Sequence, residues 1–547
     1  MLAVVPDCCS RLRGTPAAGL ATALVIFLGL SGVAAPARAQ DAAAERRIDI
    51  WEYRVEGART LAQGEVERAV YPFLGPNRTI GEVERARAAL EKAYADKGFQ
   101  TVAVEIPQQQ VQDGVVILQV TEGAVGRLRV RGSRYFSLDQ IKAEAPSLAE
   151  GAVPNFNAVT RDIVGLNQQP DRRVTPALRA GVTPGTVDVD LNVEDTFPLH
   201  GSLELNNRQS QDTTPLRLNA SLRYDNLWQL GHSLTLGYQV APENRDDGEV
   251  YSGSYLARFP RTPWFSLLGY ATKNNSDIST LGGTNVVGRG ETIGLRGMAT
   301  LPSKTDDLFH QVSGGLDYKH FDELVGLGGD TNQSTPITYY PVSVDYTASW
   351  TAEESQTDAG LGLTFNLRGL GSTDTRFRDK RFNSAGDFFY LRGNVSRTQE
   401  IYAAMQLVAR LQGQLSSKPL PSSEEISAGG ADTVRGYLES EALGDNGIVG
   451  SVELRSPSLT EVGGEDWSDG IVNDWRVYAF VDGAVLAVLR PPAEQDDRFD
   501  LASVGVGTSI RLIDYLNGSV DVGIPLVTQA SSSAGDPRVH FRVWGEF

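Results

Sequence analysis

After its first 39 residues the chain has no cysteine, no long apolar run and a shortage of positive charge. Its two cysteines, Cys8 and Cys9, both lie near the amino terminus of the 547 residues. The net charge is −18, which argues against a nucleic-acid-binding protein because such proteins carry a basic surface. A membrane-spanning helix needs about 20 apolar residues. The longest candidate, residues 477–489, is shorter and contains Asp482, so helical spans are excluded.

The sequence also lacks the usual patterns of enzymes and metal proteins. It contains only five histidines, and none stands at a metal-ligand spacing such as H-E-x-x-H. There is no G-x-S-x-G turn and no phosphate-binding loop. Without cysteine in the main body of the chain there is no thiol nucleophile. We therefore predict no enzyme activity, no catalytic residue, no metal site and no cofactor, although barrel enzymes of the outer membrane remain an alternative.

Residues 1–39 have the pattern of a secretory signal peptide. Arg11 and Arg13 precede the apolar stretch 18–30, and Ala37-Arg38-Ala39 provides a small-x-small cleavage site. We expect the mature chain to begin at Gln40. A transmembrane anchor is the alternative, but the apolar core is short for a membrane span. The pattern predicts an exported protein that has no cysteine after cleavage.

Residues 48–196 mix helical and strand patterns and contain a duplication. Two openings, Val55-x-Gly57 and Val130-x-Gly132, are each followed by two helical stretches and then by strands with alternating apolar residues. We predict two α+β units of β-α-α-β-β order, residues 48–123 and 124–196. One larger α+β domain is the alternative. The acidic residues of the last strand, Asp188, Asp190 and Asp195, are expected on a solvated face.

Residues 197–547 consist almost entirely of strand patterns and turns. Their length and alternation predict the antiparallel strands of a transmembrane β-barrel. The count is even, as a bacterial single-chain barrel requires. We place sixteen strands near residues 201–206, 216–224, 234–240, 250–259, 264–272, 292–300, 309–321, 337–351, 359–370, 388–398, 402–414, 447–455, 475–486, 501–511, 518–525 and 539–547.

Three short motifs stand at defined places in this barrel pattern. The long loop at about 415–446 contains Val434, Arg435, Gly436 and Tyr437, and the thirteenth strand contains Phe480, Asp482 and Gly483. The terminal strand carries an aromatic and apolar series: Val539, Phe541, Val543 and Phe547. In their order and spacing, these motifs and the two α+β units resemble the TpsB-type outer-membrane transporters of two-partner secretion. These proteins include the hemolysin/adhesin secretion-activation proteins, within the BamA-related superfamily.

The segments 166–185 and 225–231 also resemble this family, so the resemblance covers nearly the whole chain after the leader. It implies that the α+β units are POTRA domains. It implies as well that the loop folds back into the pore and that Arg435 meets Asp482. An unpaired charge inside a barrel is costly, whereas a hydrogen-bonded pair is tolerated. Gly436 would allow a tight turn, and Tyr437 would pack on the inner wall.

Two departures from the family pattern are visible. Ala484 stands where the family often has glycine. Only Gln40 to Arg47 precede the first strand, and eight residues are too few for a stable helix that spans a barrel. We therefore expect no plug helix of the kind that many family members carry. The inward loop would then be the main element that occludes the pore.

The resemblance implies an outer-membrane pore with its POTRA domains in the periplasm. These domains would recognise an unfolded TpsA-type exoprotein, which the pore would pass to the cell surface. Outer-membrane lipid and the barrel assembly machinery, for the protein's own insertion, are the further partners it implies. An insertion or assembly factor of the BamA type is the main alternative, and a passive channel is a weaker one.

Overall fold

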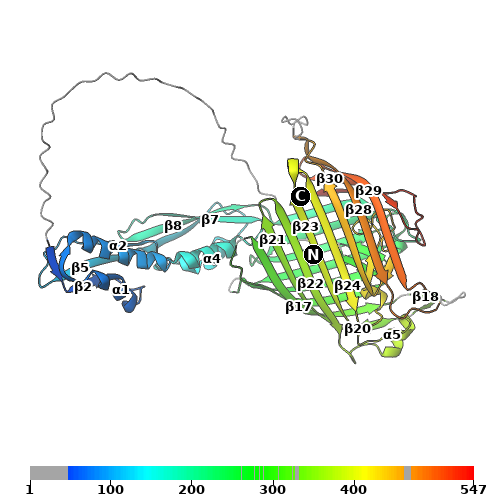
Figure 1. Cartoon of the computed structure of the whole chain (residues 1–547), viewed down its shortest axis with the longest axis horizontal. Helices are drawn as coiled ribbons and strands as arrows, with labels where there is room; N and C mark the ends of the chain where they lie inside the picture. The colour runs from blue at the N-terminus through cyan, green and yellow to red at the C-terminus, as the bar shows by residue number, and fades with distance from the viewer. Residues whose placement is uncertain are drawn as a thin grey trace, which may run out of the picture.

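The structure is a computed structural model. It describes residues 47–547 except 260–261, 276–277, 282–283, 288, 306, 323, 327–331, 335, 461–469 and 494. An elongated arm of two α+β units leads into one end of a large β-barrel (Figure 1). The expected signal peptide, residues 1–39, lies outside the described residues. Residues 40–46, the segment in which we expect no plug helix, also lie outside the described residues.

The first unit is a three-stranded sheet covered by two helices. Strand β2 (Glu52–Glu56) runs parallel to β5 (Val115–Glu122), which pairs antiparallel with β4 (Val102–Glu105). Helices α1 (Gln63–Val70) and α2 (Ile80–Asp96) supply the covering layer. A two-stranded ribbon, β1 (Arg47–Ile50) with β3 (Gly75–Thr79), is an addition that the sequence pattern did not predict.

Local side-chain chemistry sets the ends of helix α2. The Thr79 side chain accepts the Glu82 N–H, and the Glu82 carboxylate accepts the Thr79 N–H at 2.8 Å, which forms a capping box. The hydrogen bond from the Thr79 backbone and a second from Arg78 lower the pKa of Glu82. The helix stops before Gly98, whose φ of 92° is the left-handed conformation common after the end of a helix. Local side-chain and backbone features therefore define both ends of α2.

The second unit repeats this plan, with β6 (Ala124–Arg131) parallel to β8 (Thr186–Asp195) and β7 (Arg172–Ala180) antiparallel to β8. Helices α3 (Leu138–Ala143) and α4 (Phe156–Leu166) cover the sheet. The expected solvated acidic face is wrong for two residues. Asp190 is buried between Arg131 and Arg179, at 3.4 and 3.5 Å. Asp195 accepts backbone N–H groups of the turn after β6.

Sixteen antiparallel strands close into a barrel, as the sequence predicted. The eighth strand is interrupted at Tyr340, so two labels describe it, and β31 pairs with β9 to complete the ring. The strands are β9 (Leu199–Asn206), β10 (Arg217–Leu227), β11 (His232–Val240), β12 (Glu249–Arg258), β13 (Phe265–Asn274), β16 (Gly290–Thr300), β17 (Leu308–Phe321), β20 (Ile337–Tyr339) with β21 (Pro341–Ala352), β22 (Ser355–Asn366), β23 (Phe389–Glu400), β24 (Gln406–Ser416), β27 (Asn446–Arg455), β28 (Val472–Ala487), β29 (Arg498–Leu512), β30 (Leu516–Pro525) and β31 (Arg538–Glu546).

The short elements lie between barrel strands. They are the hairpins β14 (Ile278–Leu281) with β15 (Thr284–Val287), β18 (Leu324–Gly326) with β19 (Asn332–Ser334) and β25 (Ile426–Ala428) with β26 (Ala442–Gly444), and the helix α5 (Asp374–Lys380). Within the residues that the structure describes, no helix is both long and apolar enough to cross a membrane.

The two faces of the barrel wall differ as the alternation predicted. On β24 the apolar side chains of Leu407, Leu411 and Leu415 are exposed on the outer face. Val408 and Gln414, which have the opposite parity, are buried against the interior. Because neighbouring residues on a strand point to opposite sides, the outer face is an apolar surface suited to lipid and the inner face is mixed and polar.

We expect Leu411→Arg to lower the free energy of unfolding by about 2–4 kcal/mol, because it places a charge on the lipid face in the middle of β24. The adjacent Gln412→Arg points into the barrel and should have little effect. The free energy of unfolding of both variants is measured by urea titration in lipid vesicles, with heat-modifiable mobility on gels as the readout. Equal losses for the two variants would contradict this assignment of faces.

Candidate functional site

The loop between β24 and β27 lies inside the barrel. Its hairpin strands β25 and β26 contact the wall strands β27, β28 and β29. Most of its apolar side chains are fully buried, and they form one cluster with wall residues: Ile426, Ala428, Val434, Tyr437 and Ala442 with Val449, Ala484, Leu486 and Leu501. The loop therefore occupies the interior of the barrel.

Arg435 is the centre of the loop's polar contacts. Its Nε and Nη2 atoms donate to the two carboxylate oxygens of Asp482 at 2.8 and 2.9 Å, which is a bidentate pair. Its Nη1 atom donates to Glu453 at 2.7 Å. All three side chains are buried. The structure thus brings together Arg435 and Asp482, and it adds Glu453, which sequence reasoning missed.

An aromatic ring completes the environment of the guanidinium. The Arg435 Cζ atom lies 3.4 Å from the centroid of the Phe480 ring, a cation–π contact. The ring needs the space above a glycine: a Cβ atom on Gly505 would lie 2.2 Å from Phe480. Gly483, the other motif residue, has the opposite parity to Asp482 on β28 and takes no part in these contacts. Asp482, Glu453 and Phe480 of the wall therefore form one binding site for the Arg435 guanidinium group.

Gly436 and Tyr437 fix the loop backbone against the wall. Gly436 has a φ of 97°, and its backbone lies against Gly523 of β30, where a Cβ atom on Gly523 would come within 2.6 Å of the Gly436 nitrogen. The positive φ therefore favours glycine at position 436, and the close approach of the two backbones requires glycine at position 523. The Tyr437 hydroxyl lies 2.7 Å from the Val527 carbonyl oxygen, to which it donates. Ala484, the departure from the family pattern, packs its methyl group within the same apolar cluster.

A second polar anchor holds the other end of the loop. Glu424 is 2% exposed and accepts hydrogen bonds from Lys319, Tyr339 and Tyr390, at 2.5, 2.7 and 2.7 Å. These partners come from β17, β20 and β23, and an aromatic cluster that includes Phe377 of α5 surrounds them. No short motif marks Glu424. A single acidic residue in a loop gives no sequence signal, so only the tertiary structure identifies this anchor.

The segment after β9 contacts the loop as well. Arg208 donates from both terminal nitrogens to the two carboxylate oxygens of Asp432, and its side chain is 14% exposed whereas that of Asp432 is 56% exposed. The Glu439 N–H donates to the Gln209 carbonyl at 3.0 Å. Arg381, which follows α5, pairs with the buried Asp445 at the end of the loop at 2.7 Å. The loop is therefore held by polar contacts on several sides.

The terminal-strand residues lie at the closure of the barrel. Val539, Val543 and Phe547 are exposed on the outer face, and Phe541 is half-buried. The Phe547 N–H donates to the Gly201 carbonyl at 3.0 Å, and the Phe547 ring lies over Gly201, where a Cβ atom would come within 2.6 Å. The last residue thus contributes to the seam between β31 and β9.

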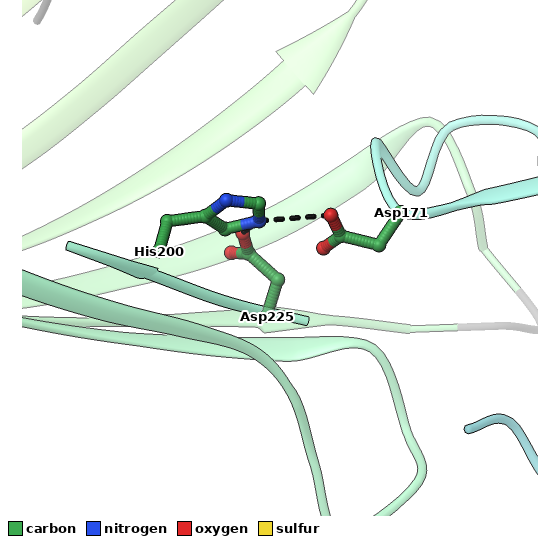
Figure 2. A group of neighbouring side chains, drawn as sticks. All are labelled: Asp171, His200 and Asp225. Carbon is green, nitrogen blue, oxygen red and sulfur yellow. Dashed lines mark hydrogen bonds and ion pairs between the residues drawn. The ribbon is translucent and has the colours of Figure 1, made fainter. Parts of the chain in front are cut away.

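The segments 166–185 and 225–231 meet where the second unit joins the barrel. The Gln229 side chain of the β10–β11 turn accepts the Ser137 N–H at 2.9 Å and donates to the Tyr135 carbonyl at 3.2 Å. Close by, Asp171, His200 and Asp225 bring three possible metal ligands together (Figure 2). No other group of this kind is found among the described residues.

Comparison with known proteins identifies two family models in the chain. A model described as "Haemolysin secretion/activation protein ShlB/FhaC/HecB" matches residues 185–510, more than half of the chain. A second, described as "POTRA domain, ShlB-type", matches residues 48–123.

Individual relatives match over most of the chain at low identity. The Outer membrane transporter CdiB of Dickeya dadantii is 22% identical, with 93% of this chain and 88% of the relative covered. The Heme/hemopexin transporter protein HuxB of Haemophilus influenzae is 20% identical, over 72% of this chain and 69% of the relative.

Two solved structures share the fold. CdiB from Escherichia coli matches with a TM-score of 0.64 and 20% identity, over 93% of this chain and 92% of that chain. BamA from Haemophilus ducreyi lacking POTRA domains 1–3 matches with a TM-score of 0.55 and 14% identity, over 91% of this chain and 100% of that chain.

We expect Arg435→Ala to loosen the loop strongly, because it leaves the Asp482 and Glu453 carboxylates buried without their partner. Loss of one member of a buried ion pair costs about 3–5 kcal/mol, so amide exchange across residues 426–444 should rise. Arg435→Lys should not restore protection, since an ammonium group cannot form the bidentate pair.

Arg498→Ala is the control, because it removes an ion pair whose two side chains are both largely exposed. Its effect should stay within about 1 kcal/mol. Hydrogen exchange with mass spectrometry measures all three variants. Equal loss of protection in Arg498→Ala and Arg435→Ala would show that Arg435 is not the main anchor.

Proposed function

The chain belongs to the ShlB/FhaC/HecB family of haemolysin secretion/activation proteins, and we propose that it exports one dedicated large exoprotein whose passage is controlled by the loop anchored at Arg435. Members of this family are outer-membrane transporters of two-partner secretion. The barrel is the membrane part, and the POTRA domains lie in the periplasm. The observation that carries the proposal is the buried Arg435–Asp482 pair inside a closed barrel of this family.

Export by this route needs no covalent chemistry. The loop occupies the interior of the barrel, so an extended chain can pass only when the loop leaves its place. The contacts that must be broken include the Arg435 pair, the Glu424 hydrogen bonds and the apolar cluster between the loop and the wall. Folding of the exoprotein outside the cell would then draw it forward.

Periplasmic recognition would use the open edges of the POTRA sheets. In the described part of the chain, β4 and β7 pair with one neighbour each. An unpaired strand edge binds an extended segment through backbone hydrogen bonds, which depend little on sequence. This mode suits an unfolded exoprotein. For these roles we assign residues 48–123 and 124–196 to the two POTRA domains and residues 197–547 to the barrel.

The protein's own route into the membrane adds two further partners. The apolar outer face of the barrel suits outer-membrane lipid. The apolar terminal strand that ends in Phe547 would be the part that the barrel assembly machinery recognises during insertion. Phe547→Ser should reduce the amount of folded, heat-modifiable barrel in the outer membrane, whereas the control Ala502→Ser should not. This result would support the role. Normal insertion of Phe547→Ser would exclude it.

An insertion or assembly factor is the second candidate, suggested by the shared fold with BamA. That likeness, at 14% identity, concerns the fold alone. Family membership favours secretion, because the matched family model describes secretion/activation proteins. The two functions differ in how many other proteins depend on this one.

Control by the loop predicts a measurable change in pore conductance. In planar lipid bilayers, the double variant Arg435→Ala/Glu424→Ala should open far more often than wild type, because both buried anchors are lost. Each single variant should fall between the two. Arg498→Ala is the control, since its ion pair with Asp500 is exposed. Wild-type conductance in the double variant would contradict a gating role.

Deletion of the gene tests the function itself. We expect one large protein to disappear from the culture supernatant while the outer-membrane proteome stays unchanged. The missing protein is then the partner. Once it is known, a photo-crosslinking residue placed at Thr175 of β7 should label it, whereas one at Thr160 on helix α4 should not. A broad fall in many barrel proteins after deletion would instead identify an assembly factor.

A further inference from the structure

The joint between the second POTRA unit and the barrel contains a mixed group of ligating side chains. Asp171 lies in the turn before β7, His200 lies on β9 and Asp225 lies on β10. Their side chains converge on one point from these three elements (Figure 2). One oxygen or nitrogen atom from each lies within 4.8 Å of those of the other two.

Their spacing is that of ligands around a small cation. The His200 Nε2 atom lies 2.8 Å from an Asp171 oxygen and 3.7 Å from an Asp225 oxygen. Ligands bound at about 2.1 Å to a tetrahedral zinc ion are separated by about 3.4 Å. The two observed distances lie on either side of this value. Small side-chain rotations would therefore bring all three groups to one ion.

A second observation points to a missing partner. Asp171 is 5% exposed, and its Oδ2 atom is buried without a hydrogen-bond partner. Both of its carboxylate oxygens face the side of the group where His200 and Asp225 lie (Figure 2). A buried carboxylate oxygen without a donor is costly, and a bound cation would satisfy it.

The charges around the group leave room for a cation. Asp171 and Asp225 supply two negative charges, and Arg223 offsets one of them through a 2.7 Å contact with the Asp225 Oδ2 atom. Thr196 adds a neutral hydroxyl near Asp171, at 3.4 Å. A second arginine, Arg258, also acts electrostatically on Asp225, although its guanidinium donates to the Gly231 carbonyl and the Ser233 hydroxyl. An imidazole among the ligands favours zinc over calcium or magnesium, which bind oxygen ligands only.

We propose that Asp171, His200 and Asp225 form a zinc site that fastens the second POTRA unit to the first two strands of the barrel. Three protein ligands leave a fourth position for water. Two of the ligands lie on neighbouring strands and the third comes from the periplasmic arm. Binding of zinc therefore restricts the angle between the arm and the barrel, and loss of zinc releases it.

Zinc binding to the full chain, purified in detergent without a histidine tag, tests the site. After treatment with a chelator, the protein is titrated with zinc chloride by calorimetry, and bound zinc is measured by mass spectrometry after desalting. We expect one zinc ion per wild-type chain. His200→Gln and Asp171→Asn should lose this binding, while His310→Gln, at a histidine outside the group, should keep it.

Two further measurements identify the ligands and the effect. Zinc-edge X-ray absorption of the wild-type protein should show oxygen and nitrogen ligands with one imidazole. Zinc should also slow amide exchange at residues 166–172 and 225–231 in wild type but not in His200→Gln. The proposal is overturned if wild type binds no stoichiometric zinc, if its absorption spectrum shows no imidazole, or if His200→Gln binds zinc as well as wild type.

Discussion

The burial of one guanidinium group determines how the interior of this barrel is organised. A charge removed from water must be matched by nearby opposite charge and by hydrogen-bond acceptors. Arg435 receives both from Asp482 and Glu453, and the Phe480 ring covers one of its faces. The acceptors lie on two adjacent wall strands, β27 and β28. The loop can therefore satisfy its arginine only in one place, and the rest of its path follows from that position.

The loop is held at two ends that differ in chemistry. At one end a buried cation from the loop meets carboxylates of the wall. At the other a buried carboxylate, Glu424, meets a lysine and two tyrosine hydroxyls of the wall. Between them lie apolar and backbone contacts and the Arg208–Asp432 ion pair. When the contacts of one anchor are weakened, the other anchor still holds the loop. Movement of the whole loop requires both to be released, which suits an element that closes a pore at rest.

The POTRA arm and the barrel are joined by polar contacts and by a short chain of aromatic rings, Tyr135, Phe197 and Tyr224. The turn that contains Gln229 and the group formed by Asp171, His200 and Asp225 both lie at this joint. Polar contacts are more readily exchanged for water than an apolar core. Such a joint is suited to changes in angle between the arm and the barrel, and a cation bound there would limit them.

The sequence alone determined the elements that depend on local pattern. Period-two alternation located all sixteen strands of the barrel. The family resemblance, carried by the motifs around Arg435 and Asp482, indicated which residues would meet. Only the tertiary structure decided the partners that come from distant strands. Glu453, Glu424 and the Asp171–His200–Asp225 group have no local signature, because their environment is formed by residues far apart in the chain. The β1–β3 ribbon and the burial of Asp190 were missed for the same reason.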